Sequence, residues 1–371
     1  MRVGWVKYKV PFIKPTFPSS VDVAVDYEKI VKANWFTNFG AFERRFREEI
    51  GSYIGENIHV CTTANATLAL DVAITALFKK NKHKVLTQSF TFAAASERLI
   101  ANNFTPVLLD INEDMQPDIN QAKKYLKDNT SSVAGILICN TFGVGNREIG
   151  EWEKLASEYK LPLIIDSAAG LGSEYIGGEK IGSRGDCEVF SFHATKPLGI
   201  GEGGAITSKN EKLIEEMRSS TNFGFNQNRR IGHIGTNAKL NEISAAIGCR
   251  QMLAFPKRLV NRQNTLRKYK KYLLKTKYSF QTNDEVSSVP FASIMAVDEA
   301  TSKQMREKLE RAGVEVRNYY APLHKEKLIT KHCDIPYELV NTESVAKRIM
   351  SVPVHDDMSE RDVELVIKIL V

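Results

Sequence analysis

The chain has few cysteines, and no two of them have the spacing of a metal site or a redox motif. The five cysteines stand at positions 61, 139, 187, 249 and 333. An odd number of cysteines this far apart gives no disulfide framework and no zinc-binding pattern. We therefore expect no metal, and interpret the cysteines as small buried side chains in a reducing compartment.

Long apolar segments are also missing. The first residues, MRVGWVKYKVPFIKP, contain no apolar run of signal-peptide length, and no other segment approaches the length of a membrane span. We expect no membrane partner and a cytoplasmic location. Low-complexity tracts and internal repeats are missing as well, and a length of 371 residues favours two domains.

The net charge of +7 is modest, and the basic residues are dispersed. The densest basic stretches are RSSTNFGFNQNRRIGH and LRKYKKYLLKTK, of which the second is typical of a solvated helix face. Because no nucleic-acid-binding motif accompanies them, we expect no nucleic-acid partner, and a DNA-binding regulator is disfavoured. A small phosphorylated substrate accounts for the positive charge equally well.

Short apolar runs alternate with amphipathic stretches along the first half of the chain. The runs IHVCT, KVLTQ, PVLLDI, VAGILICN and LPLIIDSA are typical of strands, and the segments between them of helices. Apolar strands separated by helices predict an α/β fold, with a parallel sheet covered on both faces. Ligands of such sheets bind beyond the carboxyl ends of the strands, where the polar residues are Thr62, Thr63, Asn140 and Asp166.

The pattern changes near residue 245. We place a large domain at residues 1–245 and a smaller α+β domain at residues 246–371. Residues 241–276 are predicted as a helix pair broken near Pro256, since proline interrupts helices. VPFASIMAV and VEVRNYY are then predicted as strands, and ATSKQMREKLERAG and SERDVELVIKIL as helices.

A lysine followed by a glycine-rich turn, in SFHATKPLGIGEGGAIT, is open to three interpretations. Lys196 could be a surface charge, a phosphate ligand in a nucleotide loop, or the covalent anchor of a cofactor. The glycine spacing of GIGEGG resembles a dinucleotide loop, but that loop follows a strand and opens a helix. Here a Lys-Pro pair precedes the glycines and a β-branched run follows them, which disfavours the nucleotide loop.

Asp166 ends LPLIID, the most apolar predicted strand. A carboxylate in such a place is costly unless it is paired. It could be a helix N-cap, a member of a structural ion pair, or the partner of a cationic ring nitrogen. A lysine at a nearby strand end would lose hydration, and its lowered pKa would give the nucleophilic amine that imine chemistry requires.

Two strand–helix junctions complete a possible site. TTANATLAL supplies helix N–H groups suited to a phosphate, although Thr63 or Asn65 could equally be ordinary N-caps. SFTFAAA places Phe90 and Phe92 at another junction, where core packing is the common role of phenylalanine. These segments would together supply a phosphate-binding helix start, an aromatic ring, a carboxylate and an amine. Pyridoxal 5′-phosphate needs these four groups, and its ring absorbs electrons when a C–H bond breaks.

The sequence resembles the DegT-type (DnrJ/StrS-like) nucleotide-sugar aminotransferases, which are fold-type-I pyridoxal phosphate enzymes. The segments that carry the resemblance include FTNFGAFERRFREEIGSYIG, IIDSAAGLGSEYIGGEKIGSRGD, FSFHATKPLGIGEGGAIT and GTNAKLNEISAAIGCRQM, and the likeness covers almost the whole chain. It implies a large domain with a mostly parallel seven-stranded sheet and a smaller C-terminal domain. It also implies a homodimer with shared active sites.

The resemblance also implies roles for individual residues. Lys196 would bind the cofactor covalently, Asp166 would pair with its ring nitrogen, and His193 would line the pocket. The other residues that the resemblance places at the cofactor are Phe92 on the ring, Thr63, Ala64, Asn65 and Ser191 at the phosphate, and Asn237 reaching that phosphate from the neighbouring subunit.

Four positions depart from the family pattern near the cofactor. Ala64 and Asn65 replace the usual glycine and threonine at the phosphate, Ala169 stands where a histidine or glutamine is usual near the phenolic oxygen, and Asn140 replaces a common histidine. None of these changes removes an indispensable group. Lys196 is present where the dehydratases of the family carry histidine, so transamination is favoured over dehydration.

The expected substrates are L-glutamate and a nucleotide-linked 4-keto-6-deoxyhexose, with a 3-keto sugar or a dehydratase reaction as alternatives. WFTNFG, SFHATK and TNFGF look most like the sugar C-4 aminotransferases of the family, with an amino sugar for lipopolysaccharide or other surface glycans as the product. The guanidinium groups of arginine suit a diphosphate, although NQNRRIGH could equally be a solvated loop with scattered charges. The candidate substrate-binding residues are Thr37, Arg229, Arg230, His233, Tyr319 and His324.

Overall fold

The computed structural model describes residues 8–273, 276, 278–281 and 289–371. The first seven residues, on which part of the signal-peptide expectation depends, lie outside this range, as do three residues of the LRKYKKYLLKTK stretch. Within the described residues, no helix combines the length and the apolar character that crossing a membrane requires.

A seven-stranded sheet forms the centre of the molecule, with strand order β1-β7-β6-β5-β4-β2-β3. The central strands pair in parallel, and β7 runs antiparallel to both of its neighbours. This confirms the predicted mostly parallel, seven-stranded α/β architecture. The strands are β1 (His59–Thr63), β2 (Lys84–Gln88), β3 (Thr105–Leu109), β4 (Val133–Cys139), β5 (Leu163–Asp166), β6 (Cys187–Ser191) and β7 (Gly204–Ser208).

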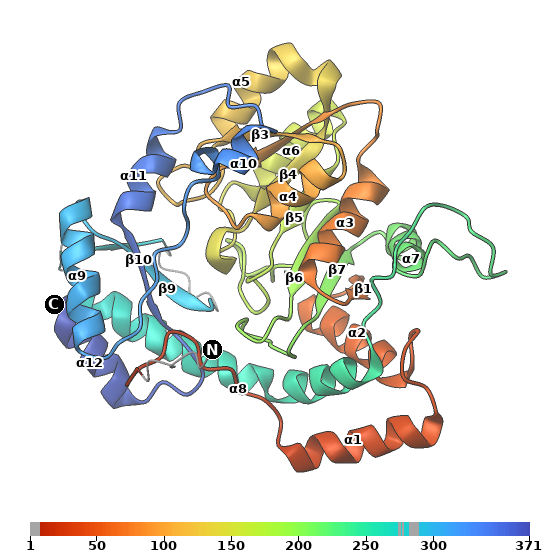
Figure 1. The fold of residues 1–371 in the computed structure, drawn as a ribbon, viewed down its shortest axis with the longest axis horizontal. Helices are drawn as coiled ribbons and strands as arrows, with labels where there is room; N and C mark the ends of the chain where they lie inside the picture. The colour runs from red at the N-terminus through yellow and green to blue at the C-terminus, as the bar shows by residue number, and fades with distance from the viewer. Residues whose placement is uncertain (1–7, 274–275, 277, 282–288) are drawn as a thin grey trace.

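Helices cover both faces of this sheet (Figure 1). Strand residues such as Ile138 and Ile165 pack with α2, α5, α6 and the first half of α8, whereas Leu137 and Ile164 pack with α3, α4 and α7. The helices are α1 (Ser20–Ala33), α2 (Ala41–Ile54), α3 (Ala66–Leu77), α4 (Ala94–Ala101), α5 (Ile119–Asn129), α6 (Ile149–Tyr159), α7 (Glu211–Ser220) and α8 (Glu242–Leu273). Burial on both faces explains the nearly continuous apolar strand sequences.

A smaller α+β unit follows, with its own apolar core. Its three-stranded sheet has the order β10-β9-β8 and is antiparallel. Its elements are β8 (Ser279–Phe280), β9 (Phe291–Met295), α9 (Glu299–Arg311), α10 (Lys327–Thr330), α11 (Val340–Arg348), β10 (Ile349–Pro353) and α12 (Glu360–Leu370). Val10, from the N-terminal segment, also packs into this core and bridges to Val314.

Helix α8 differs from the prediction. It is one helix of 32 residues with Pro256 inside it, rather than a pair broken at the proline. An interior proline removes a backbone hydrogen bond and costs about 3 kcal/mol. Phe255 and Leu259 are buried in the large core, and Leu266 and Tyr269 in the small one, so packing along its whole length keeps the helix continuous. The predicted domain boundary at residue 246 falls within its first turns.

The predicted strand VEVRNYY is also wrong. The segment makes only single bridges, Val10 to Val314 and Arg317 to Ser351, and forms no extended ladder. Alternating β-branched residues favour a strand. A strand forms, however, only where a neighbouring segment can pair with it over several consecutive residues.

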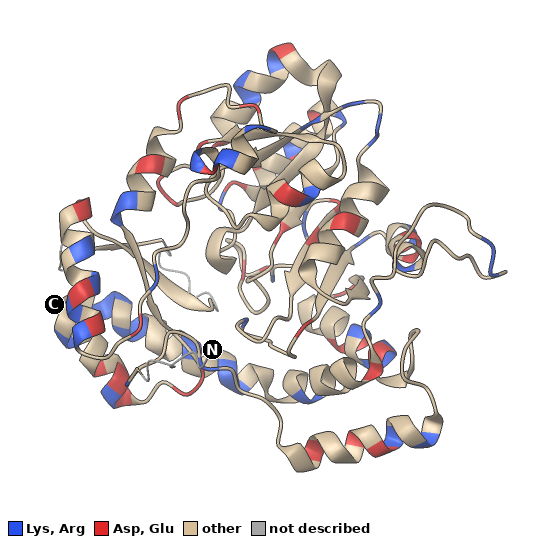
Figure 2. Ribbon diagram, in the orientation of Figure 1, with Lys and Arg blue, Asp and Glu red and all other residues tan. Residues whose placement is uncertain are grey.

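Charges of both signs are interspersed over the helices (Figure 2). The clearest basic protrusion is the hairpin between α7 and α8, which projects from the body and carries Arg229 and Arg230 near its tip.

Candidate active site

The carboxyl ends of neighbouring strands bring the main candidate residues into one row. In register, Thr63 of β1 pairs with Gly204 of β7, and Gly204 pairs with Ser191 of β6. Asp166 pairs with Val189 on one side and with Cys139 on the other. The sheet topology therefore places Thr63, Ser191 and Asp166 at one edge, as expected for the ligand-binding edge of an open α/β sheet.

Asp166 is buried, with 4% of its surface exposed. Its Oδ1 accepts a hydrogen bond from the backbone N–H of Ala168 at 3.0 Å. Burial raises the pKa of the Asp166 carboxyl, while the Ala168 N–H and the charge of Lys196 act in the opposite direction. A carboxylate in this position is stabilised further by a cation placed against it.

Lys196 lies in the turn that follows β6, and its backbone N–H donates to the carbonyl of His193 at 2.8 Å. Burial lowers the pKa of the Lys196 amine, and the nearby Asp166 and Cys139 act to raise it. Lys196 and Asp166 therefore lie close enough for the charge of each to shift the pKa of the other. A lowered pKa increases the fraction of neutral, nucleophilic amine.

An aromatic wall stands beside this pair. Phe92 is 62% exposed although it lies at the strand ends, and its ring centroid is 6.1 Å from that of Tyr320. Tyr320 stacks on Phe142 at 5.2 Å, with 27° between the ring planes. Burial raises the pKa of the Tyr320 phenol, and the nearby Cys139 and Asp166 raise it further. Sequence analysis missed Tyr320, although it selected the adjacent Tyr319.

The start of α3 lies against the same row of strand ends. The Asn65 side chain caps the helix by accepting from the Leu68 N–H at 2.9 Å, while the Ala64 N–H donates to the Ala238 carbonyl at 2.7 Å. The N–H groups of the first helical turn, on Ala66 and Thr67, have no acceptor within the helix. The anion-binding donors at this junction are therefore better assigned to residues 66 and 67 than to Ala64.

Gly204 permits this close approach. A Cβ atom on Gly204 would lie 2.7 Å from Ala66 N, Asn65 C and Thr63 Oγ1. Any side chain at position 204 would therefore push the first turn of α3 away from β6 and β7, and from Ser191.

Ser191 and His193 follow β6 as predicted. The Ser191 Oγ accepts from the His193 N–H at 3.3 Å. His193 Nδ1 lies 2.8 Å from Thr195 Oγ1, and Nε2 lies 3.7 Å from Glu202. His193 is partly exposed, so its ring borders the turn that carries Lys196.

Two of the four departures from the family pattern occupy different places. Asn140 is buried, and its side chain points into a polar cluster that includes Ser167 and Tyr175. Ala169 lies against the loop after β4, because a Cβ on Gly143 would come 2.3 Å from the Ala169 carbonyl oxygen. Neither side chain adds a charged group to the pocket.

Four predicted substrate residues have no hydrogen bond or ion pair to Lys196 within the described part of the chain. Thr37 is exposed between α1 and α2, Arg229 and Arg230 are exposed near the hairpin tip, and His233 Nε2 lies 2.8 Å from Ser220 Oγ at the hairpin base. Asn237, predicted at the cofactor phosphate, is exposed just before α8, with Lys239 Nζ 2.7 Å from its Oδ1. The next residue, Ala238, accepts from the Ala64 N–H at the start of α3.

The two candidates of the small unit also have structural partners. His324 Nδ1 lies 2.7 Å from Ser89 Oγ and its Nε2 lies 3.2 Å from Glu343, so both ring nitrogens are engaged. These contacts favour a role in joining the segment after residue 320 to the end of β2. Tyr319 stacks on Tyr320 with 5.3 Å between ring centroids and thus backs the aromatic wall.

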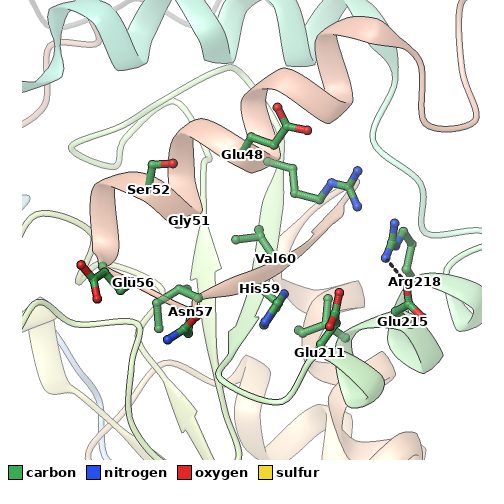
Figure 3. A pocket seen from close by; sticks show the side chains of 14 residues that line it. Glu48, Gly51, Ser52, Glu56, Asn57, His59, Val60, Glu211, Glu215 and Arg218 are labelled. Atoms are coloured by element: carbon green, nitrogen blue, oxygen red, sulfur yellow. Dashed lines mark hydrogen bonds and ion pairs between the residues drawn. The ribbon is translucent and has the colours of Figure 1, made fainter.

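A separate hollow of about 900 Å³ lies elsewhere, at the amino end and outer edge of β1 (Figure 3). It is bordered by Glu48 of α2, by His59 at the start of β1 and by Glu211 and Arg218 of α7. Because ligand sites of open α/β sheets lie at the carboxyl ends of the strands, we assign the chemistry to the pocket around Lys196.

Comparisons with known proteins agree with this geometry. The sequence profile described as the DegT/DnrJ/EryC1/StrS aminotransferase family matches residues 21–371. The chain is 40% identical over 365 residues to protein Rv3402c of Mycobacterium tuberculosis, covering 97% of this chain and 89% of that one. It is 31% identical over 330 residues to the UDP-4-amino-4,6-dideoxy-N-acetyl-β-L-altrosamine transaminase of Campylobacter jejuni, covering 86% of each chain.

A solved structure gives the same assignment. A putative pyridoxal-phosphate-dependent aminotransferase from Bacillus cereus superposes with a TM-score of 0.90 at 31% identity, covering 97% of this chain and 99% of that one. The fold and the cofactor predicted from the sequence are thereby confirmed. The chain belongs to the DegT/DnrJ/EryC1/StrS family and is a pyridoxal-phosphate-dependent nucleotide-sugar aminotransferase.

Proposed function

We propose that the enzyme moves the amino group of L-glutamate onto C-4 of a nucleotide-linked 4-keto-6-deoxyhexose, giving an amino sugar nucleotide for glycan synthesis. The observation that carries the proposal is the mutual charge interaction of Lys196 and Asp166 at the strand ends. Tyr320, which contacts Phe92, lies near the same Asp166 carboxyl. The Campylobacter relative, whose name specifies a 4-amino sugar, supports C-4. The five cysteines form no disulfide, which supports a reducing compartment such as the cytoplasm.

The residues of this pocket fit pyridoxal phosphate. The exposed face of Phe92 offers a flat apolar surface, and the buried Asp166 carboxylate gains from a cation such as a protonated ring nitrogen. When bound, the cofactor supplies an electron sink for the electrons of the broken C–H bond. Asp166 would hold the proton on the ring nitrogen, and Phe92 with Tyr320 would keep water from that side of the pocket.

Lys196 has two tasks in this proposal. Its desolvated amine attaches the cofactor and, once released, carries a proton between the two carbon atoms that exchange the amino group. Asp166 counters the loss of hydration, because its charge raises the pKa that burial lowers. His193 borders the same turn and would line the pocket.

The phosphate would lie at the start of α3. Ser191 offers a hydroxyl group at the end of β6, whereas the hydroxyl of Thr63, two strands away at the end of β1, donates to the Asn65 carbonyl at 2.9 Å. Asn65 fixes the helix start by capping it. The N–H groups of Ala66 and Thr67 would donate to the phosphate, since unpaired first-turn N–H groups and the helix dipole favour an anion there.

We also propose a homodimer in which the hairpin reaches the partner's pocket. Ile231 is 71% exposed and Ile234 is 89% exposed, so this segment presents apolar surface that a second copy would cover. Arg229 and Arg230 near the tip would meet the substrate diphosphate, and Asn237 the cofactor phosphate, in the other subunit. Thr37 and His233 would then lie beside the shared site.

A two-stage experiment tests the function. Glutamate alone should convert the bound cofactor to its amino form, which a change in visible absorption reports. A panel of keto-sugar nucleotides should then restore the original spectrum only with acceptable acceptors. No spectral change with glutamate or other amino donors would reject transamination, and restoration only by 3-keto sugars would reject the C-4 assignment.

A further inference from the structure

A buried polar cluster lies behind Asp166, on the other face of the sheet. It consists of Asn140, Ser167, Tyr175 and Glu188, each at most 1% exposed. Val189 is the register partner of Asp166. Because successive strand residues point to opposite faces, the preceding residue, Glu188, faces away from the Asp166 side.

The Glu188 carboxylate accepts four hydrogen bonds. Its Oε2 accepts from Ser167 Oγ at 2.5 Å and from the Tyr175 hydroxyl at 3.0 Å. Its Oε1 accepts from the backbone N–H groups of Gly182 at 2.7 Å and Arg184 at 3.0 Å. Each carboxylate oxygen thus has two donors. These hydrogen bonds lower the pKa of the Glu188 carboxyl, but burial outweighs them and raises this pKa to about 7.

The Asn140 side chain fixes which groups donate and which accept in the cluster. Its Nδ2 group donates to Ser167 Oγ at 2.8 Å and to the Tyr175 hydroxyl at 2.9 Å, while its Oδ1 accepts from the Asn146 N–H at 2.9 Å. The two hydroxyl oxygens accept hydrogen bonds from Asn140, and the same hydroxyl groups donate hydrogen bonds to Glu188. Such a fully paired buried network holds its members in one geometry.

The network fixes the backbone on both sides of the Asp166 side chain. The Asp166 carbonyl accepts from the Asn140 N–H at 3.0 Å, and the Ser167 N–H donates to the Val189 carbonyl at 2.9 Å. The Ser167 carbonyl accepts from the Gly170 N–H at 2.7 Å. Because the Ser167 side chain is hydrogen-bonded as well, the network restrains the backbone that carries Asp166.

We propose that Glu188 is a positioning residue, which through Ser167 holds the Asp166 carboxylate in line with the cofactor's ring nitrogen. This inference rests on the proposed role of Asp166. A positioning role differs from a purely structural one, because the loss of Glu188 would then weaken cofactor binding as well as the stability of the fold.

The chain contains a matched control. Asp110, after β3, is also a buried carboxylate with four donors. Its Oδ1 accepts from the Ile111 N–H, the Thr342 N–H and the Thr342 hydroxyl, and its Oδ2 from the Asn341 N–H. Asp110 joins β3, the outer strand at one edge of the sheet, to α11, away from Asp166 on the central strand β5.

The test compares Glu188→Gln with Asp110→Asn. In each variant the amide presents an NH₂ group to donors that need an acceptor, so both should lower the melting temperature. Only Glu188→Gln should weaken the binding of pyridoxal phosphate to the apoenzyme, by about tenfold or more, and shift the pH at which the absorption of the bound cofactor changes. Ser167→Ala removes one donor to Glu188 and should give a milder change in the same direction.

The outcomes separate the two proposals. If Glu188→Gln lowers the melting temperature as Asp110→Asn does but leaves cofactor affinity and spectrum unchanged, the positioning role is rejected. If Glu188→Gln does not fold, Ser167→Ala decides by the same measurements. If the wild-type protein binds no pyridoxal phosphate at Lys196, the proposed function itself fails.

Discussion

Asn140 and Glu188 share the same two hydroxyl groups. Asn140 donates to the oxygens of Ser167 and Tyr175, and both hydroxyls donate to Glu188. Asn140, where the resemblance leads us to expect a histidine, is therefore engaged in the network behind Asp166. The departure at Asn140 is thus accommodated by a buried hydrogen-bond network rather than by a new contact in the pocket.

Replacing Lys196 by alanine should abolish the covalent cofactor adduct. Borohydride reduction should trap one adduct per chain in the wild-type protein and none in Lys196→Ala, as mass spectrometry would measure. Lys209→Ala is the control, because Lys209 pairs with Glu179 at the surface and should retain the adduct. An adduct that persists in Lys196→Ala would place the anchor on another residue.

Asp166→Asn should retain the cofactor but lose most of the activity. The amide keeps the shape of the side chain and removes the charge that stabilises a protonated ring nitrogen. We expect kcat to fall by about a hundredfold or more, or about 2.7 kcal/mol of barrier, in steady-state assays with glutamate. Asp186→Asn is the control, since Asp186 bonds the Leu163 N–H at the amino end of β5, and it should lose far less.

Gly204→Ala should weaken cofactor binding at the phosphate. The added methyl group would lie 2.7 Å from three atoms of residues 63, 65 and 66, so the first turn of α3 must shift. We expect the dissociation constant of pyridoxal phosphate, measured on the apoenzyme, to rise by about tenfold. Gly150→Ala in α6 meets no atom within 4 Å, and it should leave that constant unchanged while adding about 0.5–1 kcal/mol of stability.

Mixed dimers should test the shared active site. Lys196→Ala and the double variant Arg229→Glu with Arg230→Glu should each be inactive as homodimers. In a randomly mixed population, heterodimers would combine one intact Lys196 with one intact hairpin and restore about a quarter of the wild-type sites. Activity assays after co-expression measure this, and the absence of any recovery would place both groups in the site of one chain.

His355 should make the protein less stable in acid. It is 4% exposed. Burial first, and then the charges of Arg262 and Lys14, lower its pKa to about 4, against the opposing charges of Asp357 and Asp356. The unfolded chain binds the proton near pH 6.5 and the folded chain only near pH 4, so stability falls as the pH falls through this interval.

The loss assigned to His355 is at most about 3 kcal/mol, from a pKa difference of about 2.5 between the two states. Urea unfolding at pH 7 and pH 4.5 should show a smaller loss for His355→Gln than for the wild-type protein. Equal losses would mean that His355 titrates alike in the folded and unfolded chains.

Periodicity and strand ends predicted the sheet and its binding edge well. Asp166 and Lys196 were selected from the sequence because one ends an apolar strand and the other follows one, and strand ends of a parallel sheet meet. In the structure each shifts the pKa of the other, and their roles toward the cofactor stay a prediction. Glu188 was missed although it is a carboxylate inside an apolar strand, a pattern that indicates a buried, hydrogen-bonded role. The sequence left Thr63 and Asn65 open as N-caps, and the structure selects Asn65. The resemblance placed the phosphate at Ala64, whose N–H instead donates to the Ala238 carbonyl.

Other differences arise from tertiary contacts that the sequence does not express locally. No helix was predicted over residues 20–54, where α1 and α2 form. Pro256 predicted a break that packing on two cores prevents. His324 was selected as a substrate residue from its segment alone, and its partners Ser89 and Glu343 become neighbours only in the folded chain.

The continuity of α8 limits how the two units of the molecule can move. A flexible linker would let the small unit move freely over the substrate, whereas a single helix embedded in both cores is rigid. The helix bends most easily at Pro256, where one backbone hydrogen bond is missing. Any opening or closing of the pocket that carries the small unit along must therefore bend the helix there, which keeps the amplitude small.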